Sequence, residues 1–118
     1  MKMEISIENL SPRIKILSVN GRIDAVTAPE MEKIMTNSFT EPKSGCILNL
    51  SGVDYMSSAG IRVLVLGSKM AASTGGLFYV SSLQESVRKV LEIVGFLPLL
   101  DVFADADLAK DAAVKKLV

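Results

Sequence analysis

A strand that leads directly into a helix is predicted between Cys46 and Met70, and this unit constrains the fold more than any other stretch. Residues 46–50 are apolar at nearly every position. Such a run is typical of a strand in the middle of a parallel sheet, where neighbouring elements cover both faces. The small and polar residues that follow predict that the strand ends at Ser51-Gly52. The rest of the chain must therefore supply neighbouring strands and covering helices.

The helix that follows this strand is predicted to begin near Ser57 or Ser58. Residues on one of its faces recur at helical spacing: Ile61, Leu64, Val65 and Ser68. A second apolar stripe lies on nearly the opposite side: Ala59, Val63, Leu66 and Met70. One stripe must cover the sheet. The other either packs against a neighbouring helix or forms a partner-binding patch, since folded domains seldom expose large apolar surfaces without a use for them.

Alternating and helical patterns predict the remaining elements. Strands are expected at 3–8, 13–19, 77–81 and 99–103, and helices at 27–41, 82–94 and 105–117. The first two strands form a hairpin. Capping-box spacing occurs at Thr27–Glu30 and again at Ser82–Glu85, and Asp105 is the expected N-cap of the last helix. The buried face of the helix at 82–94 is expected to consist of Val87, Val90, Leu91 and Val94.

Together these elements predict an α/β domain. The order strand, helix, strand from Ile14 to Leu50 implies a parallel pair joined by a right-handed crossover. We expect a small mixed β-sheet of about four to five strands, with about four helices packed mainly on one side, in a single domain that spans residues 1–118. Because parallel strands end at the same edge of a sheet, the loop with Asp24 and the turn with Ser58 should be neighbours.

Asp24 and the serine pair each allow two interpretations from the residues alone. Aspartate is common in turns because its side chain bonds to nearby backbone groups, so Asp24 reads first as a turn residue. A serine at a helix start is usually a cap that stabilises the helix by about 1 kcal/mol. A helix N-terminus also offers unpaired N–H groups and the positive end of the helix dipole, which favour an anion such as a phosphate.

The composition indicates a folded domain without a nucleic-acid footprint. Hydrophobic residues make up 49% of the 118 residues, which excludes a disordered chain. Thirteen basic and thirteen acidic side chains give a net charge of zero, so we expect no direct binding to DNA or RNA. No apolar run is long enough to span a bilayer and no secretory segment opens the chain, so a cytoplasmic protein without membrane contact is predicted.

Few residues could carry catalysis. The sequence contains no histidine, which removes the commonest general base and metal ligand and makes a histidine-based serine triad impossible. Gly75-Gly76 lacks the further glycine and the lysine of a nucleotide-binding P-loop. Cys46 lies in the middle of an apolar run, which predicts a buried structural thiol. We therefore expect a binding protein with no enzyme activity, metal or cofactor.

Three segments resemble a known family. Residues 50–64 read Leu-Ser-Gly-Val-Asp-Tyr-Met-Ser-Ser-Ala-Gly-Ile-Arg-Val-Leu and resemble the signature of STAS domains of the bacterial anti-sigma factor antagonist family. Residues 21–29 resemble that family's first strand-to-helix turn, and residues 75–80 resemble its next strand. The resemblance covers roughly Ile5 to Phe103. It implies a STAS fold and a regulatory role in bacterial signal transduction.

The resemblance also implies a phosphorylation site. The family's usual motif is Asp-Ser-(Ser, Thr or Ala)-Gly, and an anti-sigma kinase phosphorylates its first serine. Aligned on Met56 and Gly60, that serine is Ser58, while Ser57 stands where the motif has its aspartate. The family's partner-facing surface includes the loop with Asp24. The expected partner-binding residues are Asp24, Ser57, Ser58, Ala59, Gly60, Arg62, Val63 and Leu66.

The function implied by the resemblance is that of a partner switch. When unphosphorylated, the protein would sequester an anti-sigma factor serine kinase, and phosphorylation of Ser58 would release that kinase. A PP2C-type phosphatase would then reset the switch. The alternatives are a STAS subunit of a transport or lipid-trafficking system, a small-ligand-binding regulatory module, and an enzyme that the sequence does not reveal.

Overall fold

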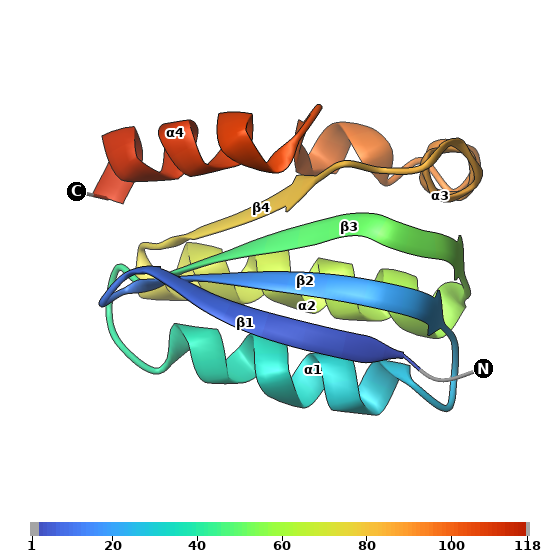
Figure 1. Cartoon of the computed structure of the whole chain (residues 1–118), viewed down its shortest axis with the longest axis horizontal. Helices are drawn as coiled ribbons and strands as arrows, with labels where there is room; N and C mark the ends of the chain where they lie inside the picture. The colour runs from blue at the N-terminus through green and yellow to red at the C-terminus, as the bar shows by residue number, and fades with distance from the viewer. Residues whose placement is uncertain (1–2, 118) are drawn as a thin grey trace.

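A five-stranded mixed sheet forms the centre of the computed structural model, which describes residues 3–117 (Figure 1). Its strands follow the chain in the order β1-β2-β3-β4-β5. β1 pairs with β2 in antiparallel orientation, and the other neighbours are parallel. The strands are β1 (Glu4–Ser11), β2 (Ile14–Ile23), β3 (Gly45–Met56), β4 (Leu77–Ser81) and β5 (Asp101–Phe103). The helices are α1 (Ala28–Thr36), α2 (Ser58–Thr74), α3 (Glu85–Ile93) and α4 (Ala106–Leu117), with 3₁₀ turns η1 (Asn37–Phe39) and η2 (Leu97–Leu99).

Hydrophobic clusters cover both faces of this sheet. Successive residues of a strand point to opposite faces, and in the central strands both sets are apolar. Leu17 and Leu48 belong to the larger cluster, to which α1, α2 and α3 contribute. Ile16 and Ile47 belong to the smaller cluster beneath α4. Figure 1 shows α1 and α2 side by side along one face and α4 on the other side. The predicted α/β fold, with helices mainly on one side, is confirmed.

Strand β3 is longer than predicted, because it continues past Ser51-Gly52 to Met56. Its second half still pairs with β2, as far as Ile23 opposite Met56. The strand β4 does not extend beside this half, and side chains take its place. The Gln84 amide Nε2 donates to the Ser51 carbonyl oxygen at 2.7 Å, and the Ser86 hydroxyl donates to the Asp54 carbonyl oxygen at 2.8 Å. These bonds satisfy carbonyl oxygens in the second half of β3, which lies beyond the apolar run that predicted the strand.

Neither predicted capping box forms, although helices begin close to both positions. Thr27 is the N-cap of α1, but its side chain makes no cap hydrogen bond and bonds to the preceding turn instead. The N-cap of α3 is Gln84, while Ser82 has a positive φ of 63°. The expected buried face of α3 is right for Val87 and Leu91, right only in part for the half-buried Val90, and wrong for Val94. Val94 is 54% exposed because the helix ends at Ile93, before the residue can turn toward the core.

The last helix and the cysteine agree with expectation. The Leu108 N–H donates to the Asp105 carboxylate at 2.9 Å, so Asp105 is the N-cap of α4. Cys46 is fully buried, and burial raises the pKa of its thiol to about 12. The short strand predicted within residues 99–103 is β5. Between residues 3 and 117, no helix is long and apolar enough to cross a membrane.

Candidate partner-binding site

The turn after β2 and the start of α2 lie side by side, as predicted. Strands β2 and β3 run parallel and end in register, with Ile23 opposite Met56. The Ser57 N–H then donates to the Ile23 carbonyl oxygen at 2.8 Å. Asp24 and Ser58 each follow one partner of that hydrogen bond. The parallel pairing therefore brings two positions far apart in the sequence onto one edge of the sheet.

The two serines at this edge have different environments. Ser57 is half-buried and is the N-cap of α2, where its hydroxyl accepts a hydrogen bond from the Ala59 N–H at 3.3 Å. Ser58 is exposed and is the first residue of the helix. A hydroxyl in that position can receive a phosphoryl group in water beside the positive end of the helix dipole. The capping interpretation therefore holds for Ser57, whereas Ser58 is exposed to solvent.

The face that α2 turns toward the sheet differs from both predicted stripes. Its buried residues are Gly60, Val63, Leu64, Gly67 and Ala71. A Cβ atom on Gly60 would lie 2.7 Å from Ile23 Cγ2 and from Met56 Cγ, and one on Gly67 would lie 2.7 Å from the Phe78 ring. The helix therefore packs closely on the sheet through its glycines. A search for apolar periodicity gives glycine no weight, and for this reason the face was predicted incorrectly.

Two of the expected partner-binding residues consequently belong to the core. Val63 is only 2% exposed, and Gly60 is buried beneath the first turn of α2. The expectation that Val63 lies near the surface is wrong. Ala59 and Leu66 are half-buried, and Arg62 is exposed. The accessible part of the candidate surface on α2 is therefore made by Ser58 and Arg62, with Ala59 and Leu66 contributing in part.

Hydrogen bonds of Asp24 stabilise the turn between β2 and α1. Its carboxylate oxygen Oδ1 accepts from the Val26 N–H at 3.0 Å and from the Thr27 N–H at 3.1 Å. In return, the Thr27 hydroxyl accepts from the Asp24 N–H at 2.9 Å and donates to the Arg22 carbonyl oxygen at 2.8 Å. The backbone N–H groups of Thr27 and Val26 are the main cause of a lowered Asp24 pKa.

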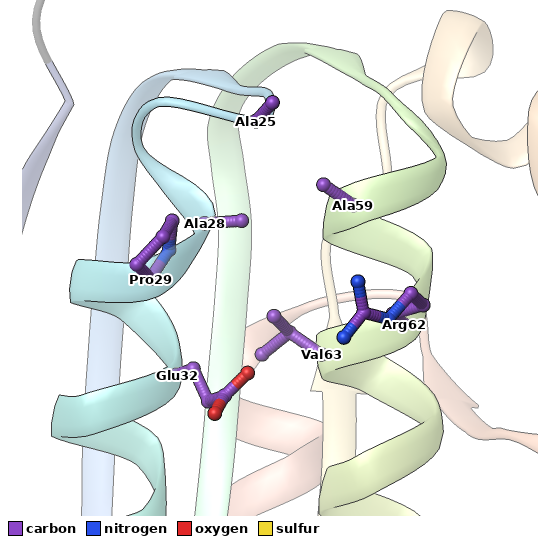
Figure 2. Close-up of a pocket in the computed structure, with 7 residues that line it drawn as sticks. All are labelled: Ala25, Ala28, Pro29, Glu32, Ala59, Arg62 and Val63. Atoms are coloured by element: carbon purple, nitrogen blue, oxygen red, sulfur yellow. The ribbon is translucent and has the colours of Figure 1, made fainter.

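A pocket of about 360 Å³ opens between the N-terminal halves of α1 and α2 (Figure 2). It is lined by Ala25, Ala28, Pro29, Glu32, Ala59, Arg62 and Val63. Figure 2 shows the side chains of Glu32 and Arg62 reaching into it from opposite helices. A second pocket adjoins it along α2. Glu32 and Arg62 line this pocket too, together with Val65, Leu66 and Lys69. The two pockets form a groove that begins beside the turn of Asp24.

Sequence reasoning missed three features of this edge. Val26 lies in the turn and is 85% exposed. Glu32 faces the groove from α1, which sequence patterns had treated only as a covering helix. The guanidinium of Arg22 stacks over the exposed Tyr55 ring, 4.0 Å from its centroid. The exposure of Val26 could have been predicted from the sequence, because a valine in a polar turn is unusual. The Arg22–Tyr55 stack depends on the pairing of β2 with β3, and the position of Glu32 depends on the packing of α1 against α2.

The described side chains at this edge form no cluster of metal ligands. Among residues 3–117, no three histidine, cysteine, aspartate or glutamate side chains gather in a way that could hold a metal ion. What the edge does present is an exposed hydroxyl, a structured turn and a groove with both charges at its rim.

Comparison with known proteins identifies the family. The STAS domain model matches residues 8–109. A curated relative from Bordetella bronchiseptica, named BtrV and described as an anti-sigma factor antagonist, is 29% identical over 113 residues. That match covers 96% of this chain and 96% of the relative. The similarity therefore extends over nearly the whole length of both proteins.

Solved structures share the fold. An anti-sigma factor antagonist from Mycobacterium paratuberculosis superposes with a TM-score of 0.83 at 23% identity, over 96% of this chain and 95% of that one. Unphosphorylated SpoIIAA, also an anti-sigma factor antagonist, gives 0.79 at 17% identity over 98% and 99%. The phosphorylated form of SpoIIAA, from Bacillus, gives 0.70 at 16% identity over 92% and 98%. Since the family model matches most of its length, the chain belongs to the STAS domain family.

Proposed function

We propose that this protein is an anti-sigma factor antagonist controlled by phosphorylation of Ser58. Unphosphorylated, it binds and sequesters a serine-kinase anti-sigma factor, and the phosphorylated form releases it. A PP2C-type phosphatase restores the binding form. The observation that carries the proposal is the exposed Ser58 hydroxyl at the start of α2, next to the turn of Asp24. Relatives named as anti-sigma factor antagonists support the class of partner.

Ser58 is a better phosphate acceptor than Ser57 on physical grounds. The Ser57 hydroxyl accepts a hydrogen bond from the Ala59 N–H, so phosphorylation there would have to replace the cap of α2. Losing a serine cap costs about 1 kcal/mol of helix stability. Ser58 is exposed, so its phosphate keeps its water and gains the favourable end of the helix dipole.

The phosphate acts as a charge in an interface. A phosphoserine adds about 1.5 to 2 negative charges at pH 7. At a closed protein interface this group would lose water, and an uncompensated buried charge costs several kcal/mol. Because about 1.4 kcal/mol is a factor of ten in affinity, the expected loss is at least about a hundredfold. Such a loss is large enough to release the kinase.

Phosphate mapping with a matched pair of serine variants tests this proposal. Each purified histidine-kinase-like anti-sigma factor encoded in the same genome is incubated with this protein and ATP. The expected result is one added phosphate by intact mass, located on Ser58 by peptide mapping. Ser58→Ala should remain unmodified and bind constitutively, while Ser57→Ala should still be modified.

Four results would count against it. Modification that persists in Ser58→Ala would move the phosphate to Ser57. Undiminished binding after full phosphorylation would show that the phosphate does not release the kinase. Absence of binding and of phosphate transfer with every such kinase would refute the assignment as an antagonist, and specific binding to a membrane transporter subunit would favour the transport alternative instead.

A further inference from the structure

The turn between β2 and α1 displays a large apolar side chain, Val26, to solvent beside the exposed Ala25. Val26 lies at the tip of this turn and is 85% exposed. The adjoining groove is lined at this end by Ala25, Ala28 and Ala59. A single exposed valine is common on protein surfaces. This one differs because the backbone on which it stands is held by hydrogen bonds on both sides, next to Ser58. A side chain fixed in this way can be buried by a partner at a small cost in conformational entropy.

The hydrogen bonds that hold the backbone around Val26 all involve Asp24 or Thr27. The Asp24 carboxylate accepts from the N–H groups of Val26 and Thr27, and the Thr27 hydroxyl accepts from the Asp24 N–H. The Asp24 carbonyl oxygen accepts from the Ala28 N–H at 2.8 Å, which joins the turn to α1. One carboxylate oxygen of Asp24 is therefore already occupied within its own chain.

We propose that Asp24 is a positioning residue for partner binding: its carboxylate fixes the turn of residues 24–27, and Val26 makes the contact. This inference rests on the proposed function and names the part of the surface that meets the anti-sigma factor. The partner must offer an apolar recess to Val26, and it needs no cation for Asp24. A direct ion pair with Asp24 makes the opposite prediction, so the two roles can be separated.

Asparagine at position 24 separates the two roles. Its side-chain carbonyl oxygen can accept the same two N–H bonds without the negative charge. Affinity for the cognate anti-sigma factor, purified and loaded with ADP, is measured by calorimetry. Asp24→Asn should bind within about threefold of the unmodified chain, and Asp24→Ala should bind at least about tenfold more weakly. Amide exchange at Val26 and Thr27 should remain slow in the asparagine variant and become fast in the alanine variant.

Thr27 provides an independent test that leaves the carboxylate in place. Thr27→Val keeps the shape of the side chain but removes the bonds from the Asp24 N–H and to the Arg22 carbonyl oxygen. It should weaken binding by at least about tenfold, whereas Thr27→Ser, which keeps the hydroxyl, should stay within about threefold. Thermal melting confirms that each variant is folded at the temperature of the binding assay.

A matched pair of valine substitutions tests the contact itself. Val26→Asp should weaken binding by at least about tenfold. Val114→Asp makes the same chemical change on α4, which covers the smaller hydrophobic cluster on the opposite face of the sheet. Val114 is 40% exposed, and this variant should leave affinity unchanged. Both affinities are measured with the same ADP-loaded anti-sigma factor.

Distinct outcomes would overturn this inference and the proposed function. If the original chain binds its anti-sigma factor but Asp24→Asn loses as much affinity as Asp24→Ala while its turn amides stay protected, Asp24 contacts the partner directly. Normal binding by Val26→Asp would also overturn the inference. In either case the antagonist function stands. If the original chain binds no anti-sigma factor, the proposed function itself fails.

Discussion

The Ser57 N–H donates a hydrogen bond of 2.8 Å to the carbonyl oxygen of Ile23, and this contact joins the end of β2 to the start of α2. It continues the parallel pairing of β2 with β3 by one residue beyond Met56. Each partner in the bond is followed at once by a residue of the candidate surface, Asp24 after Ile23 and Ser58 after Ser57. This backbone hydrogen bond thus holds the exposed Ser58 beside the turn.

Phosphorylation of Ser58 should leave the fold nearly unchanged. The added charge lies at the favourable end of the α2 dipole and in water, so we expect the thermal midpoint to move by no more than about 3 °C. Differential scanning calorimetry of the unmodified, phosphorylated and Ser58→Asp forms measures this. Ser58→Asp has less charge and fewer acceptor oxygens, so it should reproduce the loss of binding only in part. A phosphorylated form that melts many degrees lower would contradict release through an interface charge.

Val63→Asp should destabilise the fold as a whole. Val63 is 2% exposed in the larger cluster, at the floor of the groove between α1 and α2, and a carboxylate there would lose water and disrupt the apolar packing. We expect a loss of at least about 3 kcal/mol in the free energy of unfolding, measured by urea denaturation. Val26→Asp is the control, since an exposed position should change by less than about 0.5 kcal/mol. Equal stabilities of the two variants would show that α2 does not pack on the sheet as described.

Glycine substitutions should rank according to what a new Cβ atom would meet. In Gly60→Ala the Cβ lies 2.7 Å from Ile23 Cγ2 and from Met56 Cγ, two side-chain atoms that must move, so a cost of about 1 to 3 kcal/mol is expected. In Gly76→Ala it lies 1.7 Å from the Ser44 carbonyl oxygen, which is backbone. Gly76→Ala should therefore be the more destabilising of the two in denaturant titrations. The reverse order would contradict the close approach at Gly76.

The contribution of Asp24 to stability should disappear in acid. The backbone N–H groups of Thr27 and Val26 lower its pKa from the ordinary value of 3.8. A group with a lowered pKa in the folded state stabilises the fold above its unfolded-state pKa, and this stabilisation is lost as pH falls through the folded pKa. The stability gap between the original chain and Asp24→Ala should be constant from neutral pH to about pH 4 and shrink below it. Melting curves over that range measure the gap, and a gap that grows in acid would contradict the assignment.

The Cys46 thiol should be unreactive in the folded protein. It is fully buried with a pKa raised to about 12, so almost no thiolate exists and reagents cannot reach it at pH 8. Ellman's reagent should react only as fast as the protein unfolds, and promptly in denaturant. Fast labelling under native conditions would show that the centre of β3 opens locally.

The amino-acid sequence by itself determined the elements and their order. Apolar runs such as residues 46–50 predicted the central strand, and the crossover rule placed Asp24 near Ser58 without knowledge of any contact. These predictions succeeded because they depend on local patterns and on chain connectivity. The STAS resemblance predicted Ser58 as the phosphorylated residue from a contiguous motif, and that assignment stays a prediction.

Tertiary structure alone decided which residues are accessible. Glycines turn α2 so that Val63 points inward, because the helix can approach the sheet most closely where side chains are smallest. The length of β3 depended on distant donors on Gln84 and Ser86. The groove exists only where α1 meets α2, and Val26 is exposed because Asp24 bonds to the backbone of its own turn. Such long-range contacts join residues that no short sequence window contains, so the sequence could predict that Asp24 and Ser58 are neighbours but not which residues around them are accessible.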